Sequence, residues 1–156
     1  HVLDDLVYIS HYTTGIRIID IFNPEYPVEV AGYDTYPQDD GEGYYGCWGA
    51  FPYTSNGYIY ASDMQNGLFI LNFDNINAGW RQGHLYINNT IAPNVSIKSI
   101  LNNKIFSTDS NGFFHFGFPE GEHAFLINSQ DTVYIQFSGH VDIVGNIYIN
   151  NNKLPM

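Results

Sequence analysis

The sequence is poor in positive charge. Its 156 residues include five Lys and Arg against 16 Asp and Glu, which gives a formal net charge of −11. Phosphate backbones are bound chiefly by Lys and Arg, and anionic lipid surfaces attract the same residues. The composition therefore argues against nucleic acid as a partner and against adsorption to an anionic membrane surface.

Cysteine and long apolar runs are also scarce. The single cysteine, Cys47, excludes an internal disulfide and a Cys-based zinc site. Its setting, YYGCWGAF, is apolar with no Lys or Arg nearby, which favours a buried, inert thiol over a nucleophile. No window approaches the roughly 18 apolar residues that a membrane-spanning helix needs. No signal peptide is visible and the first residue is His1, so we expect a mature or partial product.

Aromatic residues are abundant, with 13 Tyr and 11 Phe, and apolar residues make up 44% of the chain. Tyr and Phe favour strands, whereas the frequent Asn and Gly supply turns. Together they predict an all-β protein.

The first half of the sequence contains an internal repeat. Residues 7–21, VYISHYTTGIRIIDI, align without a gap with residues 59–73, IYASDMQNGLFILNF. Identical residues match at Tyr8 and Tyr60, Ser10 and Ser62, Gly15 and Gly67, and Ile18 and Ile70. Each copy predicts a strand, a tight turn that ends in a positive-φ Gly, and a second strand. A sheet unit that recurs at such an interval is typical of β-propeller blades.

After the first copy comes the motif NPEYP. Its last residue, Pro27, starts PVEVAGYD, which we expect to be the outer strand of the blade, because a proline suits an edge strand. With GCWGAF and SDMQNGLF, these motifs make residues 1–73 similar to the choice-of-anchor B proteins. That resemblance implies bacterial surface or secreted proteins built from LVIVD-type propeller repeats. Because two blades cannot close a ring, we expect the C-terminal part of a larger propeller, or a piece that completes one.

From Gly83 the pattern changes to short strand-like runs separated by turn residues, which predicts a small antiparallel β-sandwich. Strand alternation places three sets of apolar residues in its core. These sets are Val95 and Ile97; Phe114, Phe116 and Phe118; and Val133, Ile135 and Phe137.

Residues 106–127 resemble the carboxypeptidase-regulatory-like domains of the transthyretin type. The resemblance rests on Thr108, Asp109, Gly112, Phe114, Pro119 and Gly121. It implies a structural module without catalytic activity. Asp109 to Gly112 predicts one hairpin turn, and Pro119 to Gly121 another. We therefore expect a partial propeller over 1–80 and a sandwich over 82–152, with the boundary within 74–82.

Two groups of residues are candidates for binding in the first half. His11 and Asp63 occupy equivalent places in the two repeats, where a propeller would bring them near one mouth of the ring. Local turns that use these side chains are the simpler reading. The aromatic residues Tyr44, Tyr45 and Trp48 form a predicted contact rim.

A third candidate is a calcium site in the acidic, Gly-rich loop over residues 34–46. Its ligands would be Asp34, Asp39, Asp40 and Glu42. The spacing does not match an EF-hand, and a solvated acidic loop is the simpler interpretation. His115, His123 and the pair His140 and Asp142 supply too few ligands for zinc, so exposed strand positions explain them better.

The sequence contains no Gly-x-Ser-x-Gly motif and no Gly-rich phosphate loop. We therefore expect a non-enzymatic, secreted or cell-surface protein that binds a protein or glycan, or upstream blades of the same protein, without a cofactor other than possible Ca²⁺. Two alternatives remain: a propeller hydrolase or lactonase with a divalent metal in its channel, and a cargo or subunit of a secretion or surface assembly.

Overall fold

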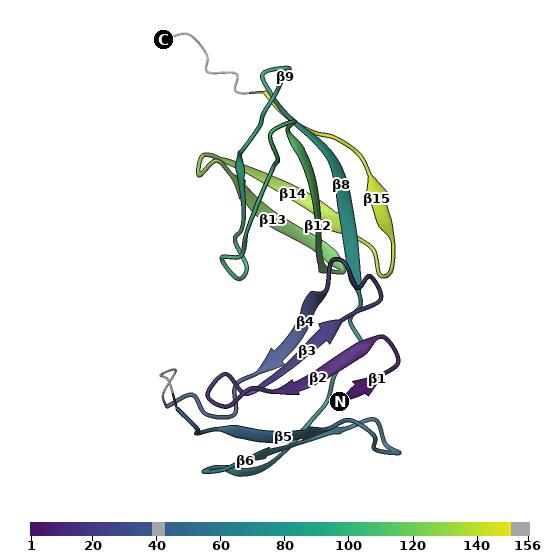
Figure 1. Ribbon diagram of the computed structural model, residues 1–156, viewed down its shortest axis with the longest axis vertical. Helices are drawn as coiled ribbons and strands as arrows, with labels where there is room; N and C mark the ends of the chain where they lie inside the picture. Colours follow the sequence, from purple (N-terminus) through teal and green to yellow (C-terminus); the bar gives the residue numbers. More distant parts are fainter. Residues whose placement is uncertain (39–42, 151–156) are drawn as a thin grey trace. The chain divides into compact units, whose positions relative to one another are not determined.

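The computed structural model describes residues 1–38 and 43–150, and every regular element in these ranges is a strand (Figure 1). The chain divides into two compact units, His1–Ala78 and Gly79–Met156. The predicted all-β fold is confirmed. Within the described part of the chain, nothing resembles a helix of the length and apolarity that crossing a membrane requires.

The first sheet of unit 1 is a four-stranded antiparallel meander in the order β1-β2-β3-β4. Its strands are β1 (Val2–Leu3), β2 (Leu6–Ser10), β3 (Ile16–Asp20) and β4 (Val28–Tyr33). The predicted outer strand, β4, lies at the edge and pairs with β3 through a bulge at Ile18 and Ile19.

The second sheet of unit 1 repeats the central hairpin of the first. It contains β5 (Cys47–Phe51), β6 (Ile59–Asp63) and β7 (Gly67–Leu71). Tyr8 pairs with Ile18 in the first sheet, and Tyr60 pairs with Ile70 in the second. The two copies of the sequence repeat therefore form hairpins of the same register. Both turns end in a glycine with positive φ, +76° at Gly15 and +85° at Gly67.

The two sheets of unit 1 pack face to face. Alternation along β2 and β3 sends Tyr8, Ile16 and Ile18 to the inner face of the first sheet, where all three are buried. From the second sheet, Ile59 and Ala61 are buried on the opposing inner face. This seam is the apolar core of unit 1.

Among residues 1–38 and 43–150, the second sheet has no counterpart of β4. After β7 the chain runs to β8 (Ala78–Ile87), which begins within the stretch that we expected to join the two domains. The amide of Ala78 donates to Oδ2 of the buried Asp20, at 2.7 Å. This hydrogen bond ties the last residue of unit 1 to β3.

Unit 2 contains two sheets. One has the order β11-β10-β13-β14, and the other the order β12-β8-β15, with β9 and β16 also paired with β8. Their bounds are β9 (Thr90–Ile91), β10 (Ser96–Ser99), β11 (Ile105–Ser107), β12 (Phe113–Pro119), β13 (Gly121–Ile127), β14 (Asp131–Phe137), β15 (Asp142–Val144) and β16 (Ile147–Ile149).

The core of unit 2 is built around phenylalanine. The three alternate residues of β12, Phe114, Phe116 and Phe118, are at most 2% exposed. Phe116 and Phe118 pack with Phe125 of β13 and Phe137 of β14, with ring centroids about 5 to 6 Å apart. The Phe114 ring lies 5.9 Å from that of Phe116. Among the other predicted core residues, Ile97 and Ile135 are buried, and Val95 and Val133 are half-buried against the same cluster.

Two features of unit 2 differ from the predictions. The sheets are not purely antiparallel, since β15 and β16 each pair with β8 in parallel. Furthermore, the predicted turns at Asp109–Gly112 and Pro119–Gly121 do not close hairpins. They form, but each joins strands of opposite sheets, β11 to β12 and β12 to β13. Turn residues fix where the chain reverses, whereas the choice of pairing partner depends on distant strands.

Candidate functional site

Exposed aromatic rings gather on unit 1 around Tyr12. The centroid of the Tyr12 ring lies 5.3 Å from that of Tyr44 and 6.2 Å from that of Trp48, with edge-to-face geometry. Nearby in sequence, Tyr36 and Tyr45 stack at 6.1 Å. Tyr44 is 79% exposed and Trp48 63%. We call Tyr12, Tyr44 and Trp48 the aromatic cluster; it includes two of the three predicted rim residues.

Backbone contacts fix the position of the cluster. Tyr12 and Cys47 exchange both backbone hydrogen bonds, at 3.1 and 2.9 Å, so the turn after β2 is held against the start of β5. A Cβ at Gly46 would lie 2.4 Å from the Tyr12 carbonyl oxygen, so glycine permits this approach. Tyr12 was not among the predicted contact residues, although an aromatic residue directly after His11 was the available signal.

Asp63 is buried, and its carboxylate is fully engaged inside unit 1. Oδ2 accepts the Thr35 hydroxyl at 2.7 Å, and Oδ1 accepts the amides of Gln65 and Asn66 at 2.9 and 2.8 Å. Burial raises the pKa of Asp63, but these three donors lower it more, and the net pKa lies below its usual value. Asp63 therefore stays ionised as a structural acceptor. Thr35 was not predicted, since nothing local marks it.

His11 has a different environment, although it holds the equivalent position in the first repeat. Its Nδ1 lies 2.8 Å from the Thr14 hydroxyl in the exposed turn after β2. The structure thus places His11 in a local turn and Asp63 in the seam.

Cys47 is a free cysteine and is buried, at 1% exposure. Burial, followed by the nearby Asp63 carboxylate, raises the pKa of this thiol. It is therefore protonated at neutral pH, as the inert-thiol interpretation requires.

Of the four predicted calcium ligands, only Asp34 lies within the described residues; Asp39, Asp40 and Glu42 lie outside them. The Asp34 carboxylate accepts the Tyr36 amide at 2.7 Å, which makes a local turn. In residues 1–38 and 43–150, no three His, Cys, Asp or Glu side chains gather as metal ligands would.

In unit 2, the carboxylate of Asp142 lies 3.1 Å from His115 Nε2 and accepts Gln82 Nε2 at 2.7 Å. The predicted partner of Asp142, His140, instead has a positive φ of 55° in the preceding turn. His123 contacts the Pro119 carbonyl oxygen at 2.9 Å through Nε2. These contacts connect neighbouring strands and turns.

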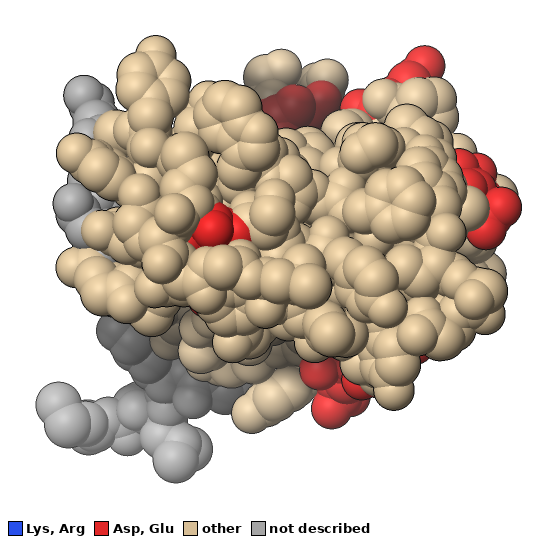
Figure 2. All heavy atoms as spheres, turned by 90° about the horizontal axis from the view of Figure 1, so that it is seen from below, with Lys and Arg blue, Asp and Glu red and all other residues tan. Residues whose placement is uncertain are grey.

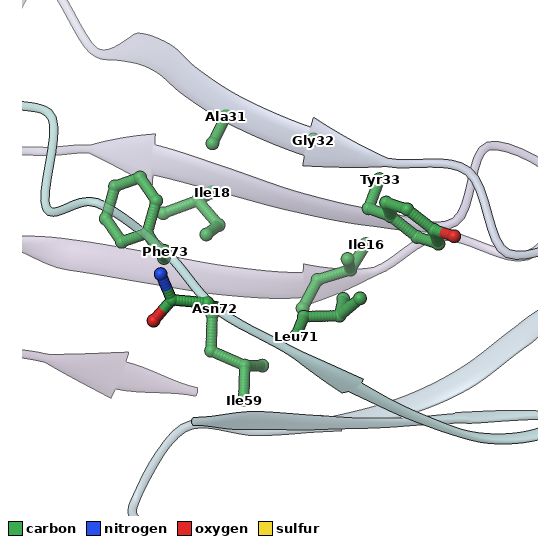
Figure 3. A pocket seen from close by; sticks show the side chains of 9 residues that line it. All are labelled: Ile16, Ile18, Ala31, Gly32, Tyr33, Ile59, Leu71, Asn72 and Phe73. Carbon is green, nitrogen blue, oxygen red and sulfur yellow. The ribbon is translucent and has the colours of Figure 1, made fainter. Parts of the chain in front are cut away.

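A small cavity remains in the seam between the two sheets of unit 1 (Figure 3). Ile16 and Ile18 line it from the first sheet, and Ile59, Leu71 and Phe73 from the second sheet and its continuation. Its volume of about 110 Å³ is well below the several hundred Å³ of a typical ligand pocket. The cavity is a gap in sheet packing, and the polar groups of its lining side chains are the Asn72 amide and the Tyr33 hydroxyl.

The first sheet of unit 1 matches a known family. A family model described as the LVIVD repeat matches residues 1–35, which cover the whole first sheet. The first half of the chain thus contains a propeller-type repeat segment. Neither the curated proteins nor the solved structures contain a significant match to this chain.

Proposed function

We propose that the chain is a non-enzymatic binding segment of a secreted or cell-surface bacterial protein, and that the aromatic cluster contacts a protein partner. The exposure of Tyr44 and Trp48 beside Tyr12 carries this proposal. Tyr and Trp are enriched at protein interfaces, where they supply large contact areas with few rotatable bonds.

The partner's contact surface is basic. The formal net charge of −11 attracts Lys and Arg, and exposed Tyr and Trp faces bind the same cations through cation–π contacts. Unit 1 then contributes blades of the choice-of-anchor B type, and unit 2 is a transthyretin-like accessory sandwich. The hydrogen bonds of Asp63 do not favour the hydrolase alternative. Its carboxylate accepts three of them, and all three donors are groups of the chain itself.

The test compares the wild type with the double variant Tyr44→Ala/Trp48→Ala. Each protein is immobilised and exposed to surface-protein extracts, and each retained protein is then purified for titration. Interface aromatics contribute about 2 kcal/mol each, so Kd rises roughly 30-fold for each substitution. Tyr134→Ala, at a 70% exposed tyrosine of unit 2, is the matched control and leaves Kd unchanged.

A partner that binds the double variant as tightly as the wild type contradicts the proposal. Binding to a glycan array, with no protein retained, would assign the cluster to carbohydrate instead.

A further inference from the structure

The chain contains three Asn-Gly pairs, and each lies in a turn between strands. They are Asn56-Gly57 between β5 and β6, Asn66-Gly67 between β6 and β7, and Asn111-Gly112 between β11 and β12. In such a pair the backbone nitrogen of glycine can attack the side-chain carbonyl carbon of asparagine, because glycine has no Cβ to hinder the approach. The surroundings of the three pairs differ, and this difference decides which pair can react.

The first pair, Asn56-Gly57, is exposed and loosely held. Asn56 Oδ1 accepts the Tyr58 amide at 3.3 Å, and the Gly57 amide donates to the Thr54 carbonyl at 3.3 Å. Both distances exceed the usual limit of about 3.2 Å for such bonds. A Cβ at Gly57 would meet nothing within 4 Å among the described residues. The turn made by Oδ1 brings the side-chain carbonyl carbon of Asn56 beside the Gly57 nitrogen, and only a long hydrogen bond engages that nitrogen.

Asn66, in contrast, is tied to another segment of unit 1. Its Nδ2, the group that deamidation releases, donates to the Thr35 carbonyl at 2.7 Å, and its backbone amide donates to Oδ1 of the buried Asp63 at 2.8 Å. Deamidation would replace the Nδ2 donor with a carboxylate oxygen that faces a carbonyl oxygen. Because the side chain must first leave Thr35, the reaction is slowed by the free energy of that local opening.

The turn that holds Asn111-Gly112 is fixed by Asp109. Oδ1 of Asp109 accepts the amides of Asn111 and Phe113 at 2.8 and 2.9 Å, and the Asp109 carbonyl accepts the Gly112 amide at 3.0 Å. Gly112 is buried, and a Cβ there would lie 2.5 Å from the Ile91 side chain. The attacking nitrogen of this pair is therefore hydrogen-bonded inside a packed turn.

The repeat shows that the turn of the first pair lies outside the packed faces of the sheets. The repeat counterparts of Asn56 and Gly57 are Asp4 and Asp5, in the turn between β1 and β2, and both are exposed. They are exposed although the second sheet covers the inner face of the first. Asp4 also carries a carboxylate at the position where deamidation of Asn56 would create one.

We propose that Asn56 is a site of spontaneous deamidation in the folded protein and that Asn66 and Asn111 are protected from it. The Gly57 nitrogen gives up its proton and forms a bond to Asn56 Cγ. The bond from Cγ to Nδ2 breaks, and Nδ2 leaves as ammonia with that proton. Water then opens the succinimide ring at either carbonyl and leaves aspartate or isoaspartate at this position. The two steps exchange one ammonia for one water, without an oxidant.

The product differs from the parent in charge and in the shape of the turn. It adds one negative charge to the formal net charge of −11. Figure 2 views the molecule from below, the side on which β5 and β6 lie in Figure 1, and no Lys or Arg is visible there. Isoaspartate also lengthens the backbone by one CH₂ within the turn, across which the Thr54 hydroxyl donates to the Tyr58 carbonyl. The product should therefore elute later than the parent from an anion-exchange column.

The test follows all three pairs in one sample of the wild type, incubated in mildly alkaline buffer for several weeks. Chymotrypsin cleaves after aromatic residues and so separates the pairs, and mass spectrometry measures the exchange of NH for oxygen in each peptide. In the folded protein Asn56 should deamidate at least roughly tenfold faster than Asn66 and Asn111, because only they require local opening. In concentrated urea the three rates should agree within about threefold, since the same opening is then complete.

Two variants assign the charged product to its site. Asn56→Gln should abolish the late-eluting species, because a glutamine side chain must close a six-membered ring, which forms far more slowly. Asn111→Gln, at another exposed turn asparagine, is the matched control and should accumulate that species at the wild-type rate. Far-UV circular dichroism verifies that both variants fold.

Deamidation of Asn66 or Asn111 in the folded protein as fast as that of Asn56 overturns the proposal, because the described contacts then give no protection. Deamidation of Asn56 in urea alone also overturns it, because the folded turn then prevents the attack.

Discussion

At the scale of single residues, the two turn glycines of the repeat differ in what surrounds them. A Cβ at Gly15 would lie 2.0 Å from the Tyr33 carbonyl oxygen, whereas a Cβ at Gly67 would meet nothing within 4 Å. Both have positive φ. Gly67→Ala should therefore lower the free energy of unfolding of unit 1 by about 1 to 2 kcal/mol, through φ alone.

Gly15→Ala should lower it by at least about 2 kcal/mol more, because the backbone of β4 must also move. Urea denaturation of both variants measures the difference. Equal effects at the two glycines would show that β4 does not pack against the turn as described.

The buried carboxylate of Asp63 makes the stability of unit 1 depend on pH. Its pKa is lowered in the folded protein, so its contribution is complete above the unfolded pKa of about 4 and is lost as pH falls through the lower, folded pKa. Asp63→Asn should remove this part of the acid dependence and cost about 1 to 3 kcal/mol at pH 7. Urea midpoints of unit 1 between pH 2 and 7 (roughly the range in which carboxyls titrate) test this, and parallel curves for wild type and variant would contradict it.

The sequence contains the signal for turn glycines but none for Thr35. A glycine after Asn or Thr between two apolar runs marks a turn by itself. The hydrogen bond from Thr35 to Asp63 joins residues far apart in the chain and depends on how the two sheets of unit 1 meet. Local sequence patterns do not predict how the two sheets pack against each other. The aromatic contact between Tyr12 and Trp48 was not predicted for the same reason.

At the scale of elements, the phenylalanines of β12 hold unit 2 together. The ring of Phe116 stacks on that of Phe106 at 4.3 Å and contacts those of Phe125 and Phe137. Phe116→Ala should cost about 3 to 5 kcal/mol, the usual range for a buried Phe. Denaturation followed by circular dichroism should show the loss in unit 2, and Tyr134→Ala should show little change. A loss below about 1 kcal/mol would mean that the cluster is not the core.

Long strands of unit 2 were predictable, and short ones were not. Alternation in β12 and β14 extends over seven residues each, enough to define a buried face. The three-residue strands β15 and β16 have too few positions to show a period, and their parallel pairing with β8 joins segments some sixty residues apart. The same non-local choice decides that the turns at Asp109 and Pro119 link opposite sheets.

At the scale of the whole molecule, β8 determines where unit 2 can be separated from unit 1. Asp142, Ile143 and Val144 of β15 pair with Trp80, Arg81 and Gln82. A fragment of residues 79–156 retains that ladder, whereas one of residues 83–156 loses it. The longer fragment should unfold cooperatively on heating, and the shorter should have a clearly lower Tm. Equal Tm values would show that residues 79–82 contribute nothing to unit 2.

Unit 1 is one hairpin used twice, and one face of each of its two sheets is buried in the seam between them. Cross-strand NMR contacts in the full chain test this most directly. The account predicts backbone contacts between Tyr8 and Ile18 and between Tyr60 and Ile70, together with side-chain contacts from Ile16 or Ile18 to Leu71 across the seam. A one-residue slip in either hairpin, or contacts that bury Leu68 and Ile70 inside unit 1, would contradict it.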